Sequence, residues 1–478
     1  MKFVGRKSEL KLLRDLKNKS SASLAVISGR RRIGKSRLAE EFGKSCTYFS
    51  FSGLPPSRGT TAKFQRKTFA LQLEKYFNVP IRYENWYELF QFLAEQTRHT
   101  NCVILFDEIS WMGAKDPEFL AILKTVWDLH FKKNDKLVLI LCGSVSYWIT
   151  KNILSSAGFV GRVSLHIRLK ELSLKECAEF WDYPASQISA YEILKVLACI
   201  GGIPRYLEEI NPKEPAEANI KRLCFNETGP LYNEFDQIFS DLFNKRAAIY
   251  KTIILSLVEG PIERNEISKH TALAPNRVLT EYLEDLIQAG FIQRDFIWNF
   301  KPQTAARLSK YRISDNYIRF YLKYIDKIRG NIEKGQLDNV HLATMSGWYS
   351  MIGLQMENLI LNNRTLILKA LHIPPEIVIN DGPYFQRKTV RLPGCQIDYL
   401  IQTKLNELYV GEVKFSQNDL KPNLIEEVKS KISRFKYPKN FSVRPFLIHM
   451  NSVTEKLEEE NYFTKIINLQ DLLSQENA

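Results

Sequence analysis

The sequence of 478 residues lacks a long uncharged apolar run, and no stretch approaches the roughly 20 apolar residues that a membrane-spanning helix needs. It also lacks the apolar core of a secretory signal, because the first residues, MKFVGRKSEL, become charged at once. We therefore expect a protein that stays in the cytoplasm and has no membrane partner.

Paired cysteines are missing as well. The seven cysteines are scattered, odd in number and without a C-x-x-C pair. Several lie in apolar runs, as Cys102 does in NCVILF and Cys142 in LVLILCGS. This pattern is typical of reduced, buried cysteines, and it argues against a disulfide framework or a zinc site.

The charge is unbalanced, with 67 Lys and Arg against 53 Asp and Glu, a formal net charge of +14. A basic surface attracts polyanions, so nucleic acid, DNA in the first instance, is an expected partner. Ordinary solubility charge explains the composition equally well. The length exceeds what one hydrophobic core usually serves, so we expect several domains.

Apolar β-like runs alternate with helical segments in residues 1–165, a pattern typical of a parallel α/β sheet. The runs 102–106 (CVILF) and 136–144 (KLVLILCGS) are apolar at nearly every position, as strands covered on both faces must be. Residues 166–240 are predicted to be a mostly helical lid.

The pattern changes in residues 241–318. An amphipathic helix, a short helix and a longer helix precede two alternating segments, FIQRDFIWNF and RLSKYRISD. In the longer helix Leu279, Tyr282, Leu283, Leu286 and Ile287 share one face. This order predicts a winged helix-turn-helix. A helical connector (319–345) and a final α/β domain (346–478) follow.

The segment SGRRRIGKSR (28–37) contains the pattern G-x-x-x-x-G-K-S, made by Gly29, Gly34, Lys35 and Ser36. It follows an apolar strand and opens a helix, the context that makes this motif credible. Backbone N–H groups of such a loop wrap the phosphates of ATP, the lysine bridges the β- and γ-phosphates, and the serine hydroxyl ligates Mg²⁺. The other residues expected to touch nucleotide in this loop are Arg30, Arg31, Arg32, Ile33 and Arg37.

A second element of this site is CVILFDEIS (102–110), a buried strand that ends in acids. We expect Asp107 to hold Mg²⁺ and Glu108 to polarise the attacking water. Ser144, at the end of a third strand, is placed to sense the γ-phosphate, unless it is simply a polar residue that ends a buried strand. Arg162 would supply charge to the transition state from a neighbouring domain or subunit; a plain surface arginine is the alternative.

These residues resemble a known group. FVGR (3–6) with Glu9, GRRRIGKS, LFDEIS, LCGS, GRV (161–163) and GGIPRYL (201–207) occur in this order. Together they resemble the archaeal and bacterial ATPases of the STAND class of P-loop NTPases, relatives of AAA+ proteins, and above all members that end in a DUF234-type domain. The resemblance implies that Val4, Gly5 and Arg6 lie near the adenine or an inter-domain seam, and that Pro204 packs on the adenine. From the residues alone, the Gly-Gly-x-Pro segment is a rigid bend.

The C-terminal pattern resembles the core of the PD-(D/E)XK nuclease superfamily. Asp398 ends one strand-like run, and Glu412 and Lys414 end the next, on one face of that strand. Such a core needs two carboxylates for Mg²⁺ and a lysine near the scissile phosphate. Glu357, in the preceding helix, stands where the family often carries a further acid. Charged residues at period two on a half-exposed strand are the alternative.

The fold class expected is thus α/β: a P-loop NTPase sheet with a helical lid, then a winged helix, then a restriction-endonuclease-like domain. Two functions stay open. One is an ATPase coupled to a nuclease-like domain that acts on nucleic acid; the other is a nucleotide-controlled switch that binds a partner or nucleic acid without cutting. Glu281, Glu284 and Asp285 on the recognition helix count against DNA reading by that helix. ATP and Mg²⁺ are the expected cofactors, and assembly into a homo-oligomer is allowed.

Overall fold

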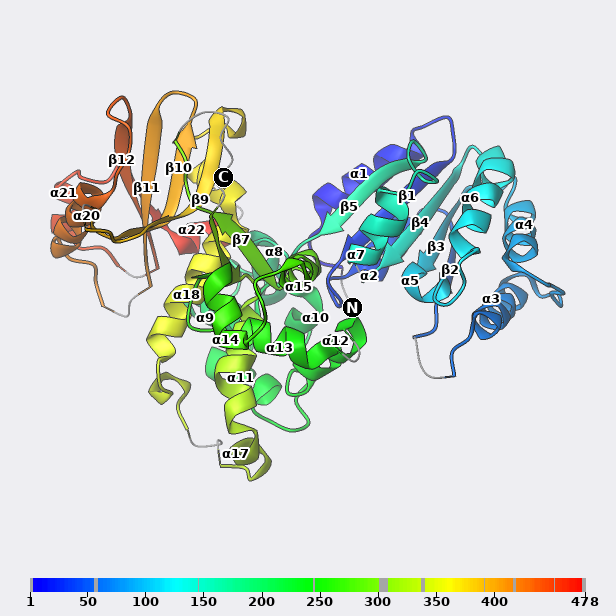
Figure 1. Cartoon of the computed structure of the whole chain (residues 1–478), viewed down its shortest axis with the longest axis horizontal. Helices are drawn as coiled ribbons and strands as arrows, with labels where there is room; N and C mark the ends of the chain where they lie inside the picture. Colours follow the sequence, from blue (N-terminus) through cyan, green and yellow to red (C-terminus); the bar gives the residue numbers. More distant parts are fainter. Residues whose placement is uncertain are drawn as a thin grey trace. The chain divides into compact units, whose positions relative to one another are not determined.

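The computed structural model describes residues 3–55, 59–144, 146–243, 246–300, 308–336, 340–390, 392–415, 418–450 and 452–474. The chain divides into two compact units, with the boundary between Lys170 and Glu171 (Figure 1). No helix in these ranges is long and apolar enough to cross a bilayer. All seven cysteines are unpaired, and all but Cys46 are buried, as predicted.

The first unit is built on a five-stranded, fully parallel sheet with the order β2-β3-β4-β1-β5. Every residue of β4 and every residue of β3 except Asp107 is buried, which confirms the prediction of strands covered on both faces. The five strands are β1 Ser23–Gly29, β2 Thr47–Ser52, β3 Cys102–Asp107, β4 Leu137–Gly143 and β5 Val163–Leu169.

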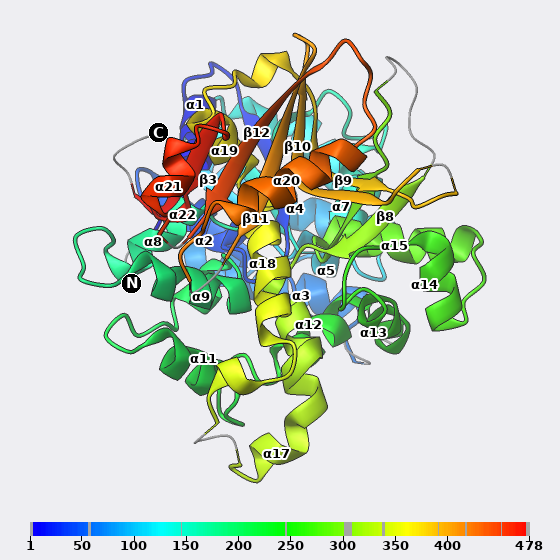
Figure 2. The same cartoon turned by 90° about the vertical axis from the view of Figure 1, so that its left-hand side faces the viewer.

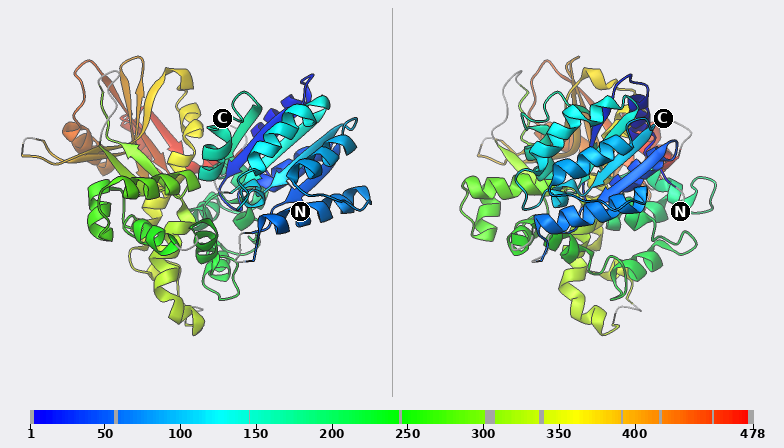
Figure 3. Two further views of the ribbon diagram at one scale, coloured as in Figure 1. Left: turned by 45° about the vertical axis from the view of Figure 1, so that its right-hand side comes forward. Right: turned by 90° about the vertical axis from the view of Figure 1, so that its right-hand side faces the viewer.

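Helices cover both faces of this sheet (Figure 3). Leu24 and Val26 of β1 belong to a core that α3, α4 and α6 complete with aromatic side chains. Ala25 and Ile27 alternate with them and so face the other side. The helices of this unit are α1 Lys7–Lys17, α2 Lys35–Gly43, α3 Ala62–Phe77, α4 Trp86–Gln96, α5 Ile109–Met112, α6 Phe119–Leu129 and α7 Ser146–Ile149.

Two strands of this sheet were not predicted from the sequence. Strand β2 (TYFSFS) and strand β5 (VSLHIRL) lie at the two edges of the sheet, and both alternate polar with apolar residues. Because β5 reaches Leu169, the predicted helical lid does not begin at residue 166. An edge strand with half its residues exposed looks like a loop or an amphipathic segment in sequence.

The second unit opens with helices. Ser173 caps the first of them with a complete capping box, and α9 is almost wholly buried. Their bounds are α8 Leu174–Ala178, α9 Ala190–Ile200, α10 Pro204–Leu207, α11 Ala216–Cys224 and α12 Glu234–Phe243.

A small antiparallel sheet, β6-β8-β7, and three helices occupy the middle of this unit. Leu279, Leu283 and Leu286 are buried on one face of α15, as the sequence predicted. The elements are α13 Ala247–Leu255, β6 Ile262–Glu263, α14 Arg264–Thr271, α15 Arg277–Ala289, β7 Ile292–Phe296 and β8 Ser309–Ile313. Their order is the one on which the winged-helix prediction rests. Strand β7 is shorter than predicted, because Trp298 and Phe300 leave the hairpin and pack on the C-terminal sheet.

The C-terminal part forms a mixed five-stranded sheet, β13-β12-β11-β10-β9, seen face-on with α20 across it in Figure 2. Strands β9, β10 and β11 are antiparallel neighbours, whereas β11, β12 and β13 run parallel. The strands are β9 Val378–Gln386, β10 Cys395–Thr403, β11 Glu407–Lys414, β12 Ser442–His449 and β13 Lys465–Asn468. The helices are α16 Asn316–Phe320, α17 Arg329–Glu333, α18 Trp348–Asn362, α19 Arg364–Ala370, α20 Asn423–Arg434, α21 Glu455–Glu459 and α22 Leu469–Leu473.

Candidate nucleotide site and carboxylate cluster

The loop between β1 and α2 adopts a backbone that depends on its glycines. Gly29 has φ of 149°, and a Cβ there would lie 2.7 Å from the carbonyl oxygen of Leu169. Gly34 has φ of 91° and forms the N-cap of α2. Both conformations are costly for residues with a side chain. The loop therefore presents backbone at the carboxyl end of β1 and at the start of a helix, where anions bind.

Lys35 is folded back into this loop. Its Nζ donates to the carbonyl oxygens of Gly29 (3.1 Å) and Arg30 (3.0 Å), and only 6% of the residue is exposed. Burial lowers the pKa of Lys35, while the nearby carboxylates of Glu108 and Asp107 oppose that shift. A buried ammonium with two carbonyl partners is ready to exchange one of them for a phosphate oxygen.

Ser36 and Asp107 come together from α2 and β3. The Ser36 hydroxyl donates to Asp107 Oδ2 at 2.6 Å, and the Glu108 N–H donates to Asp107 Oδ1 at 3.0 Å. Glu108 itself has φ of 48°, and its Oε2 accepts from the N–H (3.2 Å) and the hydroxyl (2.9 Å) of Ser144. The predicted residues Ser36, Asp107, Glu108 and Ser144 thus form one connected group at one edge of the sheet.

Arg6 joins the loop from the N-terminal segment. It is 4% exposed and donates to the Ile33 carbonyl (3.2 Å), the Lys170 carbonyl (2.6 Å) and Glu9 (3.1 Å). Val4 and Gly5 precede it, with Gly5 at φ of 69°. Arg6 therefore holds the loop backbone at Ile33 and links it to the backbone at Lys170.

The remaining arginines of the loop differ in position. Arg37 lies on α2 and pairs with Glu40 at 2.9 Å. Arg32 has φ of 66°, and Arg30 is buried. Which of them touches nucleotide stays a prediction.

Arg162 is not part of the phosphate site of its own chain. It precedes β5, and the parallel register pairs Val163 with Leu24 and Leu169 with Gly29. Arg162 therefore lies at the amino ends of the strands, whereas the phosphate loop lies at their carboxyl ends. The separation is roughly 20 Å, at about 3.3 Å per strand residue. Its guanidinium makes a bidentate pair with Asp128 at 2.8–3.1 Å. Action of Arg162 on a neighbouring chain stays a prediction, and so does the alternative of a plain surface arginine.

Pro204 is the first residue of α10, in the second unit. The preceding Gly202 accepts from the Leu172 N–H at 2.9 Å and donates to Glu171 Oε2 at 3.1 Å. A Cβ at Gly202 would lie 2.8 Å from the Leu172 carbonyl oxygen. The predicted rigid bend is confirmed, and the packing of Pro204 on adenine stays a prediction.

Asp398, Glu412 and Lys414 converge in the C-terminal sheet. The β10–β11 hairpin pairs Tyr399 with Gly411, so Asp398 and Glu412 fall opposite each other. The Val413 N–H donates to Asp398 Oδ2 at 3.0 Å, and Lys414 Nζ lies 3.1 Å from Glu412 Oε1. The hairpin that the sequence predicted does bring these three residues together.

A further lysine, Lys431 of α20, joins this cluster. Its Nζ contacts Glu412 Oε2 and lies 3.9 Å from Asp398 Oδ1. Burial, together with the charge of Glu412, raises the pKa of Asp398 to about 6. Burial and the charge of Asp398 raise the pKa of Glu357, on α18, to about 7. Lys431 therefore supplies positive charge beside Asp398, whose raised pKa means that its carboxyl resists ionisation.

The predicted metal set of Glu357, Asp398 and Glu412 is not a ready-made metal site. Among the described residues, no group of three or more His, Cys, Asp or Glu is arranged to hold a metal ion. The physical reason is visible in the cluster, where the Lys431 ammonium stands in the position a cation would take between Asp398 and Glu412. Lys431 was not predicted from the sequence. The one feature that points to it is its position on the helix that follows the Glu-x-Lys pattern.

The N-terminal end of helix α15 uses its polar residues for local contacts. Asn276 Oδ1 caps the helix by accepting from the N–H groups of Val278 (2.9 Å) and Leu279 (3.4 Å). Arg277 pairs with Glu281 at 2.9 Å. This geometry favours a structural role for α15 over groove reading.

A family model matches the N-terminal part of the chain. Residues 3–210 match a family described as an ATPase domain predominantly from Archaea. This segment is therefore similar to that ATPase family. A curated relative, an uncharacterised protein of Methanocaldococcus jannaschii, is 27% identical over 338 residues, which are 70% of this chain and 72% of the relative.

Solved structures similar to the chain include a Walker-type ATPase of Pyrococcus abyssi, with a TM-score of 0.48 and 18% identity over 67% of this chain and 96% of that one. Another is the ORC2 protein of Aeropyrum pernix, with a TM-score of 0.42 and 13% identity over 70% and 94% of the two chains. A STAND protein of Pyrococcus horikoshii with a tetratricopeptide repeat sensor has a TM-score of 0.31 and 18% identity over 77% and 51%.

The first unit offers donors that suit Mg²⁺ bound with a nucleotide. Ser36 and Asp107 present a hydroxyl and a carboxylate 2.6 Å apart. Mg²⁺ prefers oxygen ligands and is usually held by one or two protein groups together with substrate phosphates. The residues present therefore fit Mg²⁺–ATP, with Lys35 beside them for the phosphates.

Proposed function

We propose that the chain hydrolyses ATP in its first unit and uses the nucleotide state to control nucleic-acid binding by its second unit. The observation that carries the ATPase part is the connected group of Ser36, Asp107, Glu108 and Ser144 at the carboxyl edge of the parallel sheet, with Lys35 in the adjacent loop. Mg²⁺ would neutralise phosphate charge there, and Glu108 would orient the attacking water.

The test is steady-state ATP hydrolysis by the full chain and by Lys35→Ala. We expect the variant to lose hydrolysis and nucleotide binding, because Lys35 is the buried loop ammonium that is expected to bridge the β- and γ-phosphates. Lys44→Ala is the matched control, since Lys44 follows α2 and pairs with Glu41 at the surface. Unchanged turnover in Lys35→Ala would place the active site elsewhere.

Nucleic-acid binding rests on the charge balance and on the C-terminal sheet. The net charge of +14 favours a polyanion, and four basic side chains gather beside the carboxylate cluster. Binding should weaken steeply with salt, because phosphate contacts release counterions. An affinity that stays flat from roughly 50 to 200 mM salt would exclude this part of the proposal.

Phosphodiester cleavage is the second candidate, favoured by the contact of Lys414 with Glu412 and the pairing of Asp398 beside them. It requires Lys431 to leave the carboxylates. Incubation of plasmid DNA with the full chain and Mn²⁺ tests it. Nicking that disappears in Lys414→Ala supports cleavage, and nicking that persists in the variant assigns it to a contaminant.

A further inference from the structure

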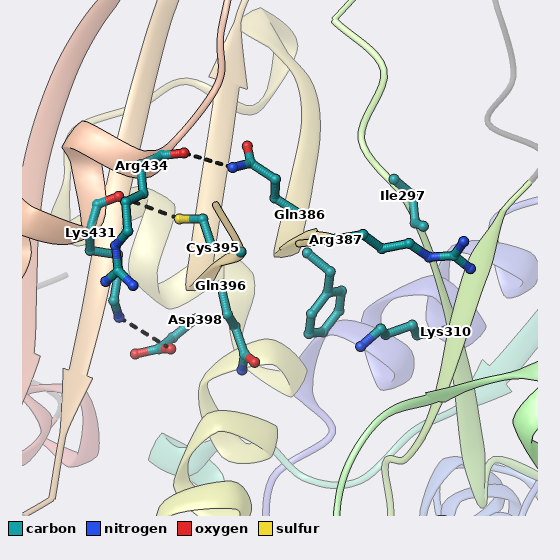
Figure 4. A pocket seen from close by; sticks show the side chains of 11 residues that line it. Ile297, Lys310, Gln386, Arg387, Cys395, Gln396, Asp398, Lys431 and Arg434 are labelled. Atoms are coloured by element: carbon teal, nitrogen blue, oxygen red, sulfur yellow. Dashed lines mark hydrogen bonds and ion pairs between the residues drawn. The ribbon is translucent and has the colours of Figure 1, made fainter. Parts of the chain in front are cut away.

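A cavity of about 430 Å³ lies beside the carboxylate cluster, within the second unit (Figure 4). Its walls come from two parts of the sequence that the domain predictions kept separate. The hairpin β7–β8 contributes Ile297 and Lys310, and the C-terminal sheet with α20 contributes the rest. The volume falls within the roughly 300–1,000 Å³ of small-ligand sites, which suits one nucleotide and not a duplex.

The segment that follows β7, together with β6, is fixed to the C-terminal sheet by contacts at several points. The Trp298 indole N–H donates to the Pro383 carbonyl at 2.9 Å, and Phe300 packs on Tyr384 and Phe435. Arg387 pairs with Glu263 of β6, beside β8. The two walls of the cavity therefore form one surface that is already in place.

The charge of the cavity is strongly positive. Its lining includes Lys310, Arg387, Lys431 and Arg434 and a single acid, Asp398. Arg387 and Lys431 already have carboxylate partners. In the described ranges neither Lys310 nor Arg434 has an ion-pair partner; Lys310 lies 4.6 Å above the Phe385 ring, and Arg434 Nε donates to the Ser430 carbonyl at 3.1 Å. Two uncompensated cations therefore face the same recess.

The chemistry of the lining selects a phosphate backbone over a base. Phe385 is 7% exposed and lies under the Lys310 ammonium, so it presents little open face for base stacking. Gln396 is exposed on β10, two residues before Asp398, so a side-chain amide lies near the Asp398 carboxylate in the cavity lining. Lys431, 3.9 Å from Asp398, offsets the repulsion that this acid would exert on a phosphate.

We propose that this cavity, built jointly by the β7–β8 hairpin and the C-terminal sheet, binds the backbone of single-stranded nucleic acid, with Lys310 and Arg434 as its phosphate contacts. This inference rests on the proposed nucleic-acid function and deepens it. It assigns contact with the single-stranded nucleic acid to the β7–β8 hairpin and not to helix α15.

The experiment measures binding of a fluorescein-labelled oligonucleotide to the full chain by anisotropy, in EDTA so that no cleavage occurs. The slope of log affinity against log salt is determined for wild type, Lys310→Ala/Arg434→Ala and Lys429→Ala. We expect the double variant to bind more weakly and to lose about 1.4 units of slope, about 0.7 for each single-strand phosphate contact. Lys429, on the same helix as Arg434 but outside the cavity, is the matched control and should keep the wild-type slope.

The charge-retaining variant Lys310→Arg/Arg434→Lys should keep the wild-type slope and so separates lost contacts from lost folding. A wild-type slope in the alanine variant would overturn the cavity assignment while leaving nucleic-acid binding intact. Absence of any binding by wild type would overturn the proposed nucleic-acid function as well. If the double alanine variant lost the same salt slope with a blunt duplex, or with polyglutamate, the single-strand assignment would be overturned.

Discussion

Glu108 and Ser144 are joined by two hydrogen bonds to a single carboxylate oxygen, Glu108 Oε2, at 3.2 Å from the Ser144 N–H and 2.9 Å from its hydroxyl. The pair links the end of β3 to the end of β4. A carboxylate that is to polarise water needs a fixed orientation, and Ser144 supplies it in this structure. Loss of either side chain should therefore act on the chemical step.

Glu108→Gln should slow ATP hydrolysis by about 10²–10⁴-fold while ATP still binds, because an amide keeps the shape but not the basicity. Single-turnover kinetics and binding of a fluorescent ATP analogue separate the two quantities. Loss of binding in the variant would speak against Glu108 as the base.

Ser144→Ala should lower kcat and leave the KM for ATP near its wild-type value, because the serine acts through Glu108. The double variant with Glu108→Gln should then be no slower than Glu108→Gln alone. Additive losses would instead indicate that Ser144 contacts the nucleotide independently.

Arg162→Ala should leave the affinity of the dilute chain for ATP unchanged, because Arg162 lies at the far edge of the sheet and pairs with Asp128. Asp128→Asn is the matched control, since it breaks the same pair but keeps the arginine. If Arg162 acts on a neighbouring chain, turnover will rise with protein concentration in wild type and in Asp128→Asn, but not in Arg162→Ala. A loss of turnover that is independent of concentration and equal in both variants would assign the pair a structural role.

Lys431→Gln should turn the carboxylate cluster into a cation site. We expect the variant to unfold more readily, by about 2 kcal/mol, less than the loss of a fully buried pair because Lys414 still contacts Glu412. Mn²⁺ should then raise its melting temperature, whereas wild type should respond little because Lys431 already neutralises the acids. Adding Asp398→Asn to the variant should abolish the Mn²⁺ response; a response that survives would place the metal elsewhere.

Trp298→Ala should destabilise the second unit by about 2 kcal/mol, part of the 3–5 typical of a fully buried tryptophan, because Trp298 is only partly buried. Phe296→Ala, in the same hairpin but 50% exposed, is the control and should change stability by less than about 0.5 kcal/mol. Urea unfolding followed by circular dichroism measures both. Equal effects would mean that the hairpin is not anchored to the C-terminal sheet.

The parts of the site that could be predicted from sequence are those with local causes. The phosphate loop lies between one strand and one helix, and Asp398 meets Glu412 through a tight hairpin, so neighbours in sequence become neighbours in space. The apolar strands β3 and β4 were predictable for the same reason, since burial on both faces leaves a continuous apolar run.

The remainder depends on contacts between distant segments. Lys431 reaches Glu412 only because α20 packs against β10, and no local pattern encodes that docking. Strand β5 was not predicted, because His166 and Arg168 interrupt its apolar residues, as an edge strand allows. The packing of Trp298 on the C-terminal sheet was hidden for a similar reason, because the segment continues the alternation of β7 after the strand has ended.

Arg6 holds the carbonyl of Ile33 in the phosphate loop and the carbonyl of Lys170, the last residue of the first unit, with the same nitrogen. The two carbonyls are 137 positions apart in the chain, the difference between 170 and 33. A shift of the loop would therefore either break the hydrogen bond from Arg6 to Ile33 or move Arg6 and disturb its hydrogen bond to Lys170. A change in the loop that Arg6 follows thus reaches the backbone at Lys170, where the first unit ends.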